Sequence, residues 1–296
     1  MNKIIETVPN FSEGRDEAVI KQISDCFRNV DEVKLLDVKP DKDHNRTVVT
    51  AIGEPEPLKN CLYKAFEIAV EKIDLKKHKG EHPRMGAVDV VPFIPVRNSN
   101  MNECIELAKE TAGVISAKYN LPIFLYEAAA TSPDRQNLAN IRKGEYEGWF
   151  EKIKDPKWKP DFGPSEVHPT AGASVFGARE YLIAFNVNLD TSDIKIADKI
   201  ARAVRGSSGG LVNVKGMGVE LSGRGIVQVS MNLVNYKKTP IFRVFEMVRL
   251  EAARYGVNVV GSELIGMAPM EALIQCADYY LRIEDFDIKQ VIENNL

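Results

Sequence analysis

The chain has 296 residues, of which 44% are hydrophobic and 27% charged, the balance of a folded protein with length for one large or two ordinary domains. A formal net charge of −3 excludes the general positive field that holds nucleic acid, and no apolar run is long enough to cross a membrane. The four cysteines lie far apart in the sequence without a CxxC pair, and the N-terminus has no signal-peptide pattern. Both features predict a cytoplasmic protein.

The first part of the chain alternates short apolar strands with amphipathic helices. We predict strands over residues 3–8, 33–38, 47–52, 88–96 and 122–126, and helices over residues 15–28, 58–73 and 102–119. Pro92 and Pro95 interrupt the fourth strand, which we therefore expect at a sheet edge or broken. The resulting order is β-α-β-β-α-β-α-β.

The periodicity fails between about residues 134 and 172, where prolines and glycines are frequent. A long irregular segment inside a compact domain is usually functional or mobile. Trp149 and Trp158 lie within it, and such large aromatic side chains normally contact a packed interior. We therefore expect an ordered, functional segment rather than plain disorder.

The strand and helix pattern then restarts. We predict strands over residues 181–189, 211–221, 225–234 and 257–260, and helices over residues 192–205, 241–255 and 269–281. This second β-α-β-β-α-β order is that of the ferredoxin-like split βαβ fold. The predicted fold class is mixed, α+β or α/β, with two ferredoxin-like βαββαβ subdomains at residues 1–178 and 179–296 and a ligand cleft between them.

The densest polar cluster is the loop from His78 to Gly86, which holds two of the four histidines. Histidine suits proton transfer near neutral pH, and Arg84 is able to grip a carboxylate through two parallel hydrogen bonds. A solvated surface loop is the alternative interpretation. A metal site is disfavoured, because Gly80 and Pro83 prevent a helix that would present His78 and His82 on one face.

Other segments give weaker signals. The polar turn at residues 8–15 places Asn10 and Ser12 before a helix, where an anion is favoured, although an ordinary strand-to-helix turn capped by Ser12 is the preferred interpretation. Residues 161–172 are turn-rich, typical of a loop over a ligand or of a domain connection. Residues 206–210 lack the lysine of a phosphate-binding loop and indicate a hairpin turn. These patterns alone indicate a two-part α/β enzyme or a ligand-binding protein.

Several motifs together resemble the glutamate formimidoyltransferase (formiminotransferase) family, and the similarity runs in register from about residue 4 to the last helix. The similar segments are residues 8–15, 43–49, 78–86, 141–147, 161–164 and 177–188.

The resemblance implies transfer of the formimidoyl group from N-formimidoyl-L-glutamate to N5 of tetrahydrofolate. The products are 5-formimidoyltetrahydrofolate and L-glutamate, as in histidine degradation and one-carbon metabolism. It implies tetrahydrofolate as co-substrate, no metal and a homodimer. Some members carry a fused cyclodeaminase, for which this chain leaves no length, so we expect any cyclodeaminase to be a separate protein.

The resemblance also implies site residues. The family's catalytic histidine falls on His82, which acts as the general base and then as the acid. We add Arg84, Arg46 and Asn10 as expected binders of substrate carboxylates or amides. The family's folate-binding span falls on Gly163, Pro164, Ser165, Glu166, Val167, His168, Pro169, Thr170, Ala171 and Gly172.

This span departs from the family pattern at two positions. His168 and Ala171 stand where other members carry an apolar residue and a tryptophan, and Ala171 removes a surface on which a pterin would stack.

Two other functions stay open. One keeps the folate site but handles another one-carbon unit, as in formyl transfer or reactions of 5-formyltetrahydrofolate. The other is a folate-binding protein without catalysis, against which the intact motif around His82 speaks.

Overall fold

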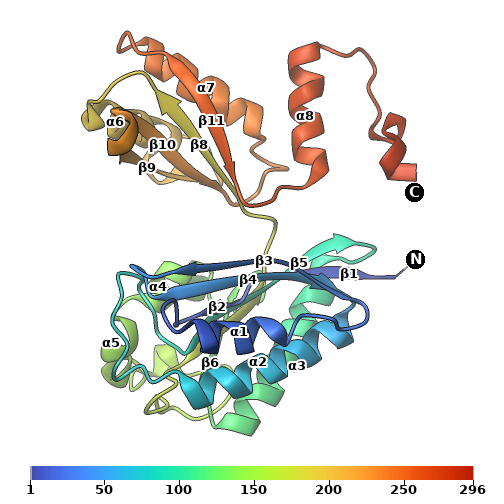
Figure 1. The fold of residues 1–296 in the computed structure, drawn as a ribbon, viewed down its shortest axis with the longest axis vertical. Helices are drawn as coiled ribbons and strands as arrows, with labels where there is room; N and C mark the ends of the chain where they lie inside the picture. Colours follow the sequence, from blue (N-terminus) through green and yellow to red (C-terminus); the bar gives the residue numbers. More distant parts are fainter. Residues whose placement is uncertain (1, 296) are drawn as a thin grey trace. The chain divides into compact units, whose positions relative to one another are not determined.

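A computed structural model describes residues 2–295, which form two compact units whose boundary falls between Arg179 and Glu180 (Figure 1). Each unit has its own β-sheet and its own hydrophobic core. Among the described residues, no helix has both the length and the apolar composition to span a membrane.

The first unit contains a seven-stranded sheet in which β4 lies between β3 and the pair β1 and β2. On the other side of that pair lies β5, followed by β7 and β6, and these last three strands run parallel. The strands are β1 (Ile4–Thr7), β2 (Asn10–Phe11), β3 (Val33–Asp41), β4 (Arg46–Gly53), β5 (Val88–Arg97), β6 (Ile123–Glu127) and β7 (Ser174–Ala178).

The helices α1 to α3 lie on one face of this sheet (Figure 1). Their ends follow local rules: Asp16 caps α1, Pro55 starts α2, and Asn100 with Glu103 forms a capping box for α3. The helices of this unit are α1 (Glu17–Asp25), α2 (Pro55–Lys72), α3 (Met101–Tyr119), α4 (Leu138–Arg142), α5 (Glu145–Lys152), η1 (Pro133–Arg135) and η2 (Pro156–Trp158).

The strand β5 is interior, so the expected edge or broken strand at residues 88–96 is wrong. The prolines are tolerated because the neighbouring strand is itself split into β1 and β2, and the β1–β5 register shifts near Pro95. The carbonyl of Pro92 accepts a hydrogen bond from the Thr7 hydroxyl at 2.9 Å. The backbone oxygen of Pro92 is therefore paired although this residue has no N–H to donate.

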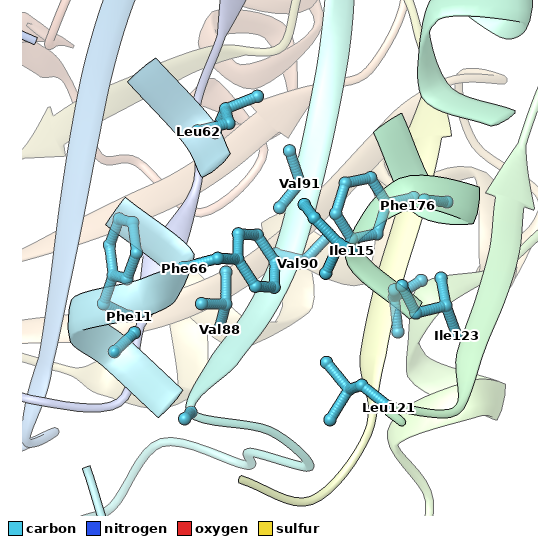
Figure 2. Close-up of a cluster of buried hydrophobic side chains, with 14 of the residues drawn as sticks. Phe11, Leu62, Phe66, Val88, Val90, Val91, Ile115, Leu121, Ile123 and Phe176 are labelled. Atoms are coloured by element: carbon cyan, nitrogen blue, oxygen red, sulfur yellow. The ribbon is translucent and has the colours of Figure 1, made fainter. Parts of the chain in front are cut away.

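The core of this unit lies between the sheet and its helices. Figure 2 shows Phe66 of α2 beside strand residues such as Val90 and Phe176, and the rings of Phe66 and Phe176 stack at 5.6 Å. The irregular segment joins this core through Trp149, which is fully buried against Phe124. The tryptophans thus anchor a segment that was expected to be irregular but contains the short helices α4 and α5.

The second unit is a four-stranded antiparallel sheet in the order β11-β8-β10-β9, with α6 and α7 packed against it. This order is the ferredoxin-like one, and the first unit repeats the same βαββαβ succession before adding α3, β6 and β7. The prediction of a mixed fold in two such subdomains is confirmed. The elements of this unit are β8 (Ile183–Leu189), α6 (Ile194–Val204), η3 (Gly206–Ser208), β9 (Val214–Leu221), η4 (Ser222–Arg224), β10 (Ile226–Leu233), α7 (Ile241–Ala253), β11 (Val259–Ile265), α8 (Met270–Leu281), η5 (Ile288–Gln290) and η6 (Ile292–Asn295).

Candidate active site around His82

The loop that carries His82 is fixed at its C-terminal end by the polar turn at residues 8–15. The Ser12 hydroxyl donates to the carbonyl of Gly86 at 2.7 Å, and the Ser12 N–H donates to the carbonyl of Ala87 at 2.9 Å. Both Ser12 and Gly86 lie in the interior of the unit. The turn therefore supports the loop by positioning its backbone.

The segment around Asn45 holds the other end of the loop. The Asn45 side chain accepts from the N–H of Gly14 at 2.9 Å and donates to the carbonyl of Lys79 at 3.0 Å. Its own carbonyl accepts from Nε2 of His78 at 2.8 Å. Asn45 adopts a positive φ of 49°, a conformation that asparagine tolerates better than most residues.

The span at residues 163–172 lies beside the same loop. The N–H of Ala87 donates to the carbonyl of Ala171, and Gly86 pairs with Gly172 in an isolated β-bridge. Gly172 has a φ of +70°, and a Cβ there would lie 2.1 Å from the carbonyl oxygen of Met85. Only glycine allows this close approach of the two segments.

The end of this span is a tight, hydrogen-bonded turn. His168 and Gly172 exchange backbone hydrogen bonds of 3.0 Å in both directions. The Nδ1 atom of His168 accepts from the N–H of Ala171 at 2.9 Å, so this ring nitrogen carries no proton. Burial lowers the pKa of His168, consistent with a neutral ring.

His82 is almost completely buried, with 6% of its surface exposed. Burial is the main cause that lowers its pKa to about 4; Arg142, Arg46 and His44 lower the pKa further, and Asp89 opposes them. Within residues 2–295, no side chain or backbone group makes a hydrogen bond to the His82 ring. The imidazole is therefore neutral at pH 7 and has a lone pair available to accept a proton.

A buried ion pair stands beside His82. Asp89 is 1% exposed, and its carboxylate accepts from Nε of Arg142 at 2.8 Å and from a second guanidinium N–H of the same residue. The other carboxylate oxygen accepts from the backbone N–H of Met85 at 2.8 Å. Asp89 thereby connects α4, which carries Arg142, to the His82 loop.

Arg46 adds a positive charge to the same place. Its Nε atom is buried without a hydrogen-bond partner, and it forms no ion pair within the described part of the chain. Burial and the neighbouring Arg142 lower its pKa, whereas Asp41 and Asp89 raise it. A half-buried guanidinium without a partner is suited to a carboxylate supplied by a ligand.

Arg84 is already paired within the protein. Its guanidinium donates to both carboxylate oxygens of Glu147 at 2.7 and 2.9 Å, and to Glu145 at 3.0 Å. Its Nε donates to Nδ1 of His78 at 3.2 Å, which fixes His78 as the neutral tautomer protonated on Nε2. His78 and Arg84 thus connect the loop to α5 through hydrogen bonds and ion pairs.

Two of the predicted site residues, His82 and Arg46, interact electrostatically in one cluster with Asp89 and Arg142. The sequence patterns did not single out Asp89 or Arg142. Asn10 lies in β2, where its side-chain amide donates to the carbonyl of Val8 at 3.0 Å. The signal for Asp89 was an acidic residue inside an otherwise apolar strand, a position that normally requires a partner.

Residues 2–295 contain no group of three or more His, Cys, Asp or Glu side chains able to hold a metal ion. The chemistry that this geometry allows is proton transfer at a neutral histidine beside an arginine that forms no ion pair within residues 2–295.

The two ferredoxin-like units and the histidine loop define a protein of the formiminotransferase type. Residues 4–179 match the formiminotransferase domain, N-terminal subdomain, and residues 184–295 match the formiminotransferase domain. The chain belongs to the formiminotransferase family.

Curated relatives match over the whole chain. Glutamate formimidoyltransferase of Streptococcus pyogenes serotype M1 is 50% identical over 100% of this chain and 99% of its own length. Its namesake from Thermoplasma acidophilum is 48% identical over 99% of this chain and 97% of its length. The formimidoyltransferase-cyclodeaminase of Dictyostelium discoideum is 48% identical over 97% of this chain but only 55% of its own length.

Proposed function

We propose that this chain is a glutamate formimidoyltransferase, which moves the formimidoyl group from N-formimidoyl-L-glutamate to N5 of tetrahydrofolate and releases L-glutamate. The proposal is supported above all by full-length similarity to relatives of that name. A buried, neutral His82 at the meeting point of the shared motifs agrees with it. Tetrahydrofolate is the co-substrate, which follows from the family.

In this reaction His82 moves one proton. N5 of the reduced pterin attacks the amidine carbon of the donor, and the N–H proton of N5 passes to the imidazole. The C–N bond to glutamate then breaks as the imidazolium returns that proton to the departing nitrogen. A positioned acid–base residue of this kind is worth roughly 10²–10⁴ in rate, and a neutral imidazole is the form that the first step needs.

Arg46 is the proposed receptor for a carboxylate of the glutamate donor. It offers an unpaired guanidinium close enough to lower the pKa of His82. An anion bound there would offset the cation and raise the pKa of His82 in the complex. The substrate would thus strengthen the base that acts on it, because a base works best when its pKa lies near the operating pH.

The folate-binding role of residues 163–172 is also a proposal. Val167 and Ala171 are buried, so the side chains that face outward are those of residues such as Ser165, Glu166 and Pro169. The half-buried imidazole of His168 is the ring within this span that a pterin is able to contact. His168 would then take over part of the stacking surface that Ala171 does not provide.

The remaining site predictions carry different weight. The expectation that Arg84 binds a substrate carboxylate stays a prediction, and its pairing with Glu147 counts against it. Within residues 2–295 no group donates to the amide oxygen of Asn10, and its role as an amide binder also stays a prediction. The same holds for a ligand cleft between the two units.

The direct test replaces His82 by Gln and measures folate-dependent loss of N-formimidoyl-L-glutamate. We expect kcat to fall by roughly 10²–10⁴. Lys154→Gln is the control, because Lys154 is exposed and pairs with Glu151. A His82→Gln variant that keeps more than about a tenth of the activity would refute the role of His82.

Two further assays distinguish the alternatives. Faster turnover with N-formyl-L-glutamate than with the formimidoyl compound would indicate a formyltransferase or an enzyme of 5-formyltetrahydrofolate. Tight binding of tetrahydrofolate without turnover of either donor would indicate a folate-binding protein.

The proposal includes a homodimer, a cytoplasmic location, a reaction without metal or nucleic acid, and a separate cyclodeaminase that consumes the product. Sedimentation equilibrium tests the dimer. Treatment with a chelator should leave kcat unchanged.

A further inference from the structure

Lys152, at the end of α5, holds its ammonium group in a cage without a carboxylate. The ammonium donates to the backbone carbonyls of Asn140, Ile141 and Lys143 at 2.8, 2.7 and 3.0 Å. It also lies over the rings of Trp149 and Trp158, at 4.4 and 4.0 Å from their centroids. No Asp or Glu within the described part of the chain forms an ion pair with it.

Those carbonyls belong to the C-terminal end of α4. This helix has only five residues, so its own hydrogen bonds stabilise it little, and its last carbonyls lack helical donors. Lys152 supplies these donors together with the indole N–H of Trp149, which donates to Ile141 at 3.1 Å. A cation at this end also favours the helix dipole.

The residue that this arrangement holds in place is Arg142, the last residue of α4. Two of the carbonyls that accept from Lys152 belong to Ile141 and Lys143, the residues on either side of Arg142. Arg142 pairs with Asp89, and Asp89 accepts from the N–H of Met85 in the loop of His82. A contiguous chain of contacts therefore leads from Lys152 to the backbone of the loop that carries His82, three residues from the histidine.

We infer that Lys152 is a positioning residue of the His82 site, acting through Arg142: its caged ammonium fixes α4 so that Arg142 occupies Asp89. Occupied in this way, Asp89 cannot turn its carboxylate to the imidazole. Displacement of Arg142 would free that carboxylate, remove a cation and admit water, and all three changes raise the pKa of His82.

The cage requires a positive charge. A neutral side chain of the same length would fill the space between the two indole rings but leave the carbonyls without donors. Burial and the neighbouring Lys143 lower the pKa of Lys152 to about 8, so the ammonium is still protonated at neutral pH. Carbonyl dipoles and ring faces together take the place of a counter-ion.

The test is an NMR titration of the His82 imidazole in a Lys152→Ala variant, with the four histidine signals assigned by single His→Gln substitutions. In the unmodified protein we expect a midpoint of about 4. The groups that act on it are Asp89, Arg142, Arg46 and His44. In the variant we expect a midpoint higher by about one pH unit or more.

Chemical rescue separates this role from general stabilisation. Lys152→Ala lacks the atoms that n-propylammonium would supply, so this cation should return the His82 midpoint toward that of the unmodified protein. The neutral 1-propanol, of the same shape, should not. Lys154→Ala is the matched control, since Lys154 is an exposed lysine two residues away paired with Glu151.

A double substitution tests the path. If Lys152 acts through Arg142, the His82 shift caused by Lys152→Ala should largely disappear when Arg142→Met is already present. Additive shifts would overturn the inference, as would an unchanged midpoint in a folded Lys152→Ala protein or equal rescue by propanol.

Should Lys152→Ala fail to fold, Trp158→Leu removes one wall of the cage and leaves the carbonyl contacts. A smaller His82 shift in the same direction supports the inference, and no shift overturns it. These readouts need no substrate. The inference rests on the proposed function only for the importance of His82, so a failed transfer assay would refute that function alone.

Discussion

Replacing Arg46 by Met tests whether an unpaired cation binds the donor and sets the basicity of His82. Methionine keeps a similar length without the charge. The substitution breaks no internal ion pair, because Arg46 forms none within residues 2–295 and its Nε has no hydrogen-bond partner. The substitution therefore removes few contacts within the protein, and its main expected effect is on ligand binding.

The magnitude follows from the contact that Arg46 would make. A hydrogen bond between a guanidinium and a carboxylate is worth about 1.5–3 kcal/mol net. We expect KM for N-formimidoyl-L-glutamate to rise by about tenfold to a hundredfold, with a much smaller change in KM for tetrahydrofolate. Lys39→Met is the control for the loss of one exposed charge, because Lys39 lies in β3 and pairs only with Asp37.

The same variant has a signature in the pH profile. In the unmodified enzyme, the acid limb of kcat/KM should reflect free His82, with a pKa of about 4. The acid limb of kcat should lie about one unit higher, because the bound carboxylate offsets Arg46. In Arg46→Met the acid limb of kcat/KM should itself lie about one unit higher than in the unmodified enzyme, because the cation that lowers the pKa of free His82 is absent.

Initial rates measured between about pH 3 and 8 at varied donor concentration give both limbs. The reasoning fails if Arg46→Met changes neither KM for the donor nor the acid limb of kcat/KM. A rise in KM for tetrahydrofolate alone would move Arg46 to the folate site.

Three other predictions follow from the loop and its supports. Gly172→Ala should lower the free energy of unfolding in urea by at least about 2 kcal/mol more than Gly144→Ala, since both have positive φ but the Cβ contact at Gly144 is an ordinary 3.4 Å. The neutral His78 has a lowered pKa. The stability that its neutral ring provides should be complete above about pH 6.5 and should decline as the pH falls toward the folded-state pKa. The free energy of unfolding of His78→Gln should therefore vary less between about pH 7 and 5 than that of the unmodified protein. Hydrogen exchange at residues 163–172 should slow with tetrahydrofolate and change little with glutamate alone.

The sequence predicted the parts of this structure that depend on local pattern. The predicted strands and helices match the observed ones to within a few residues, and the motif around His82 was recognisable as a unit, whereas α4, α5 and β7 were not predicted. The interior position of β5 was missed because tolerance of Pro92 depends on a break in the neighbouring strand, which is a long-range property.

The partners of charged residues were likewise beyond local reasoning. Arg84 was expected to bind a substrate carboxylate because it lies two residues from His82, whereas in the structure it pairs with Glu147, 63 positions away. Asp89 and Arg142 are separated by 53 positions. Their pairing follows only once α4 and β5 are placed in one unit.

The electrostatics of His82 differ from those of histidines that a carboxylate orients. There the acidic partner accepts a ring N–H and raises the pKa of the imidazole. Here Asp89 is held by Arg142 and by the N–H of Met85, so it acts on His82 only through space. Burial and two arginines hold the pKa of the ring down. In the proposed mechanism, such a histidine stays neutral in the empty site and gains basicity when the substrate carboxylate binds, which would confine efficient proton transfer to the complex.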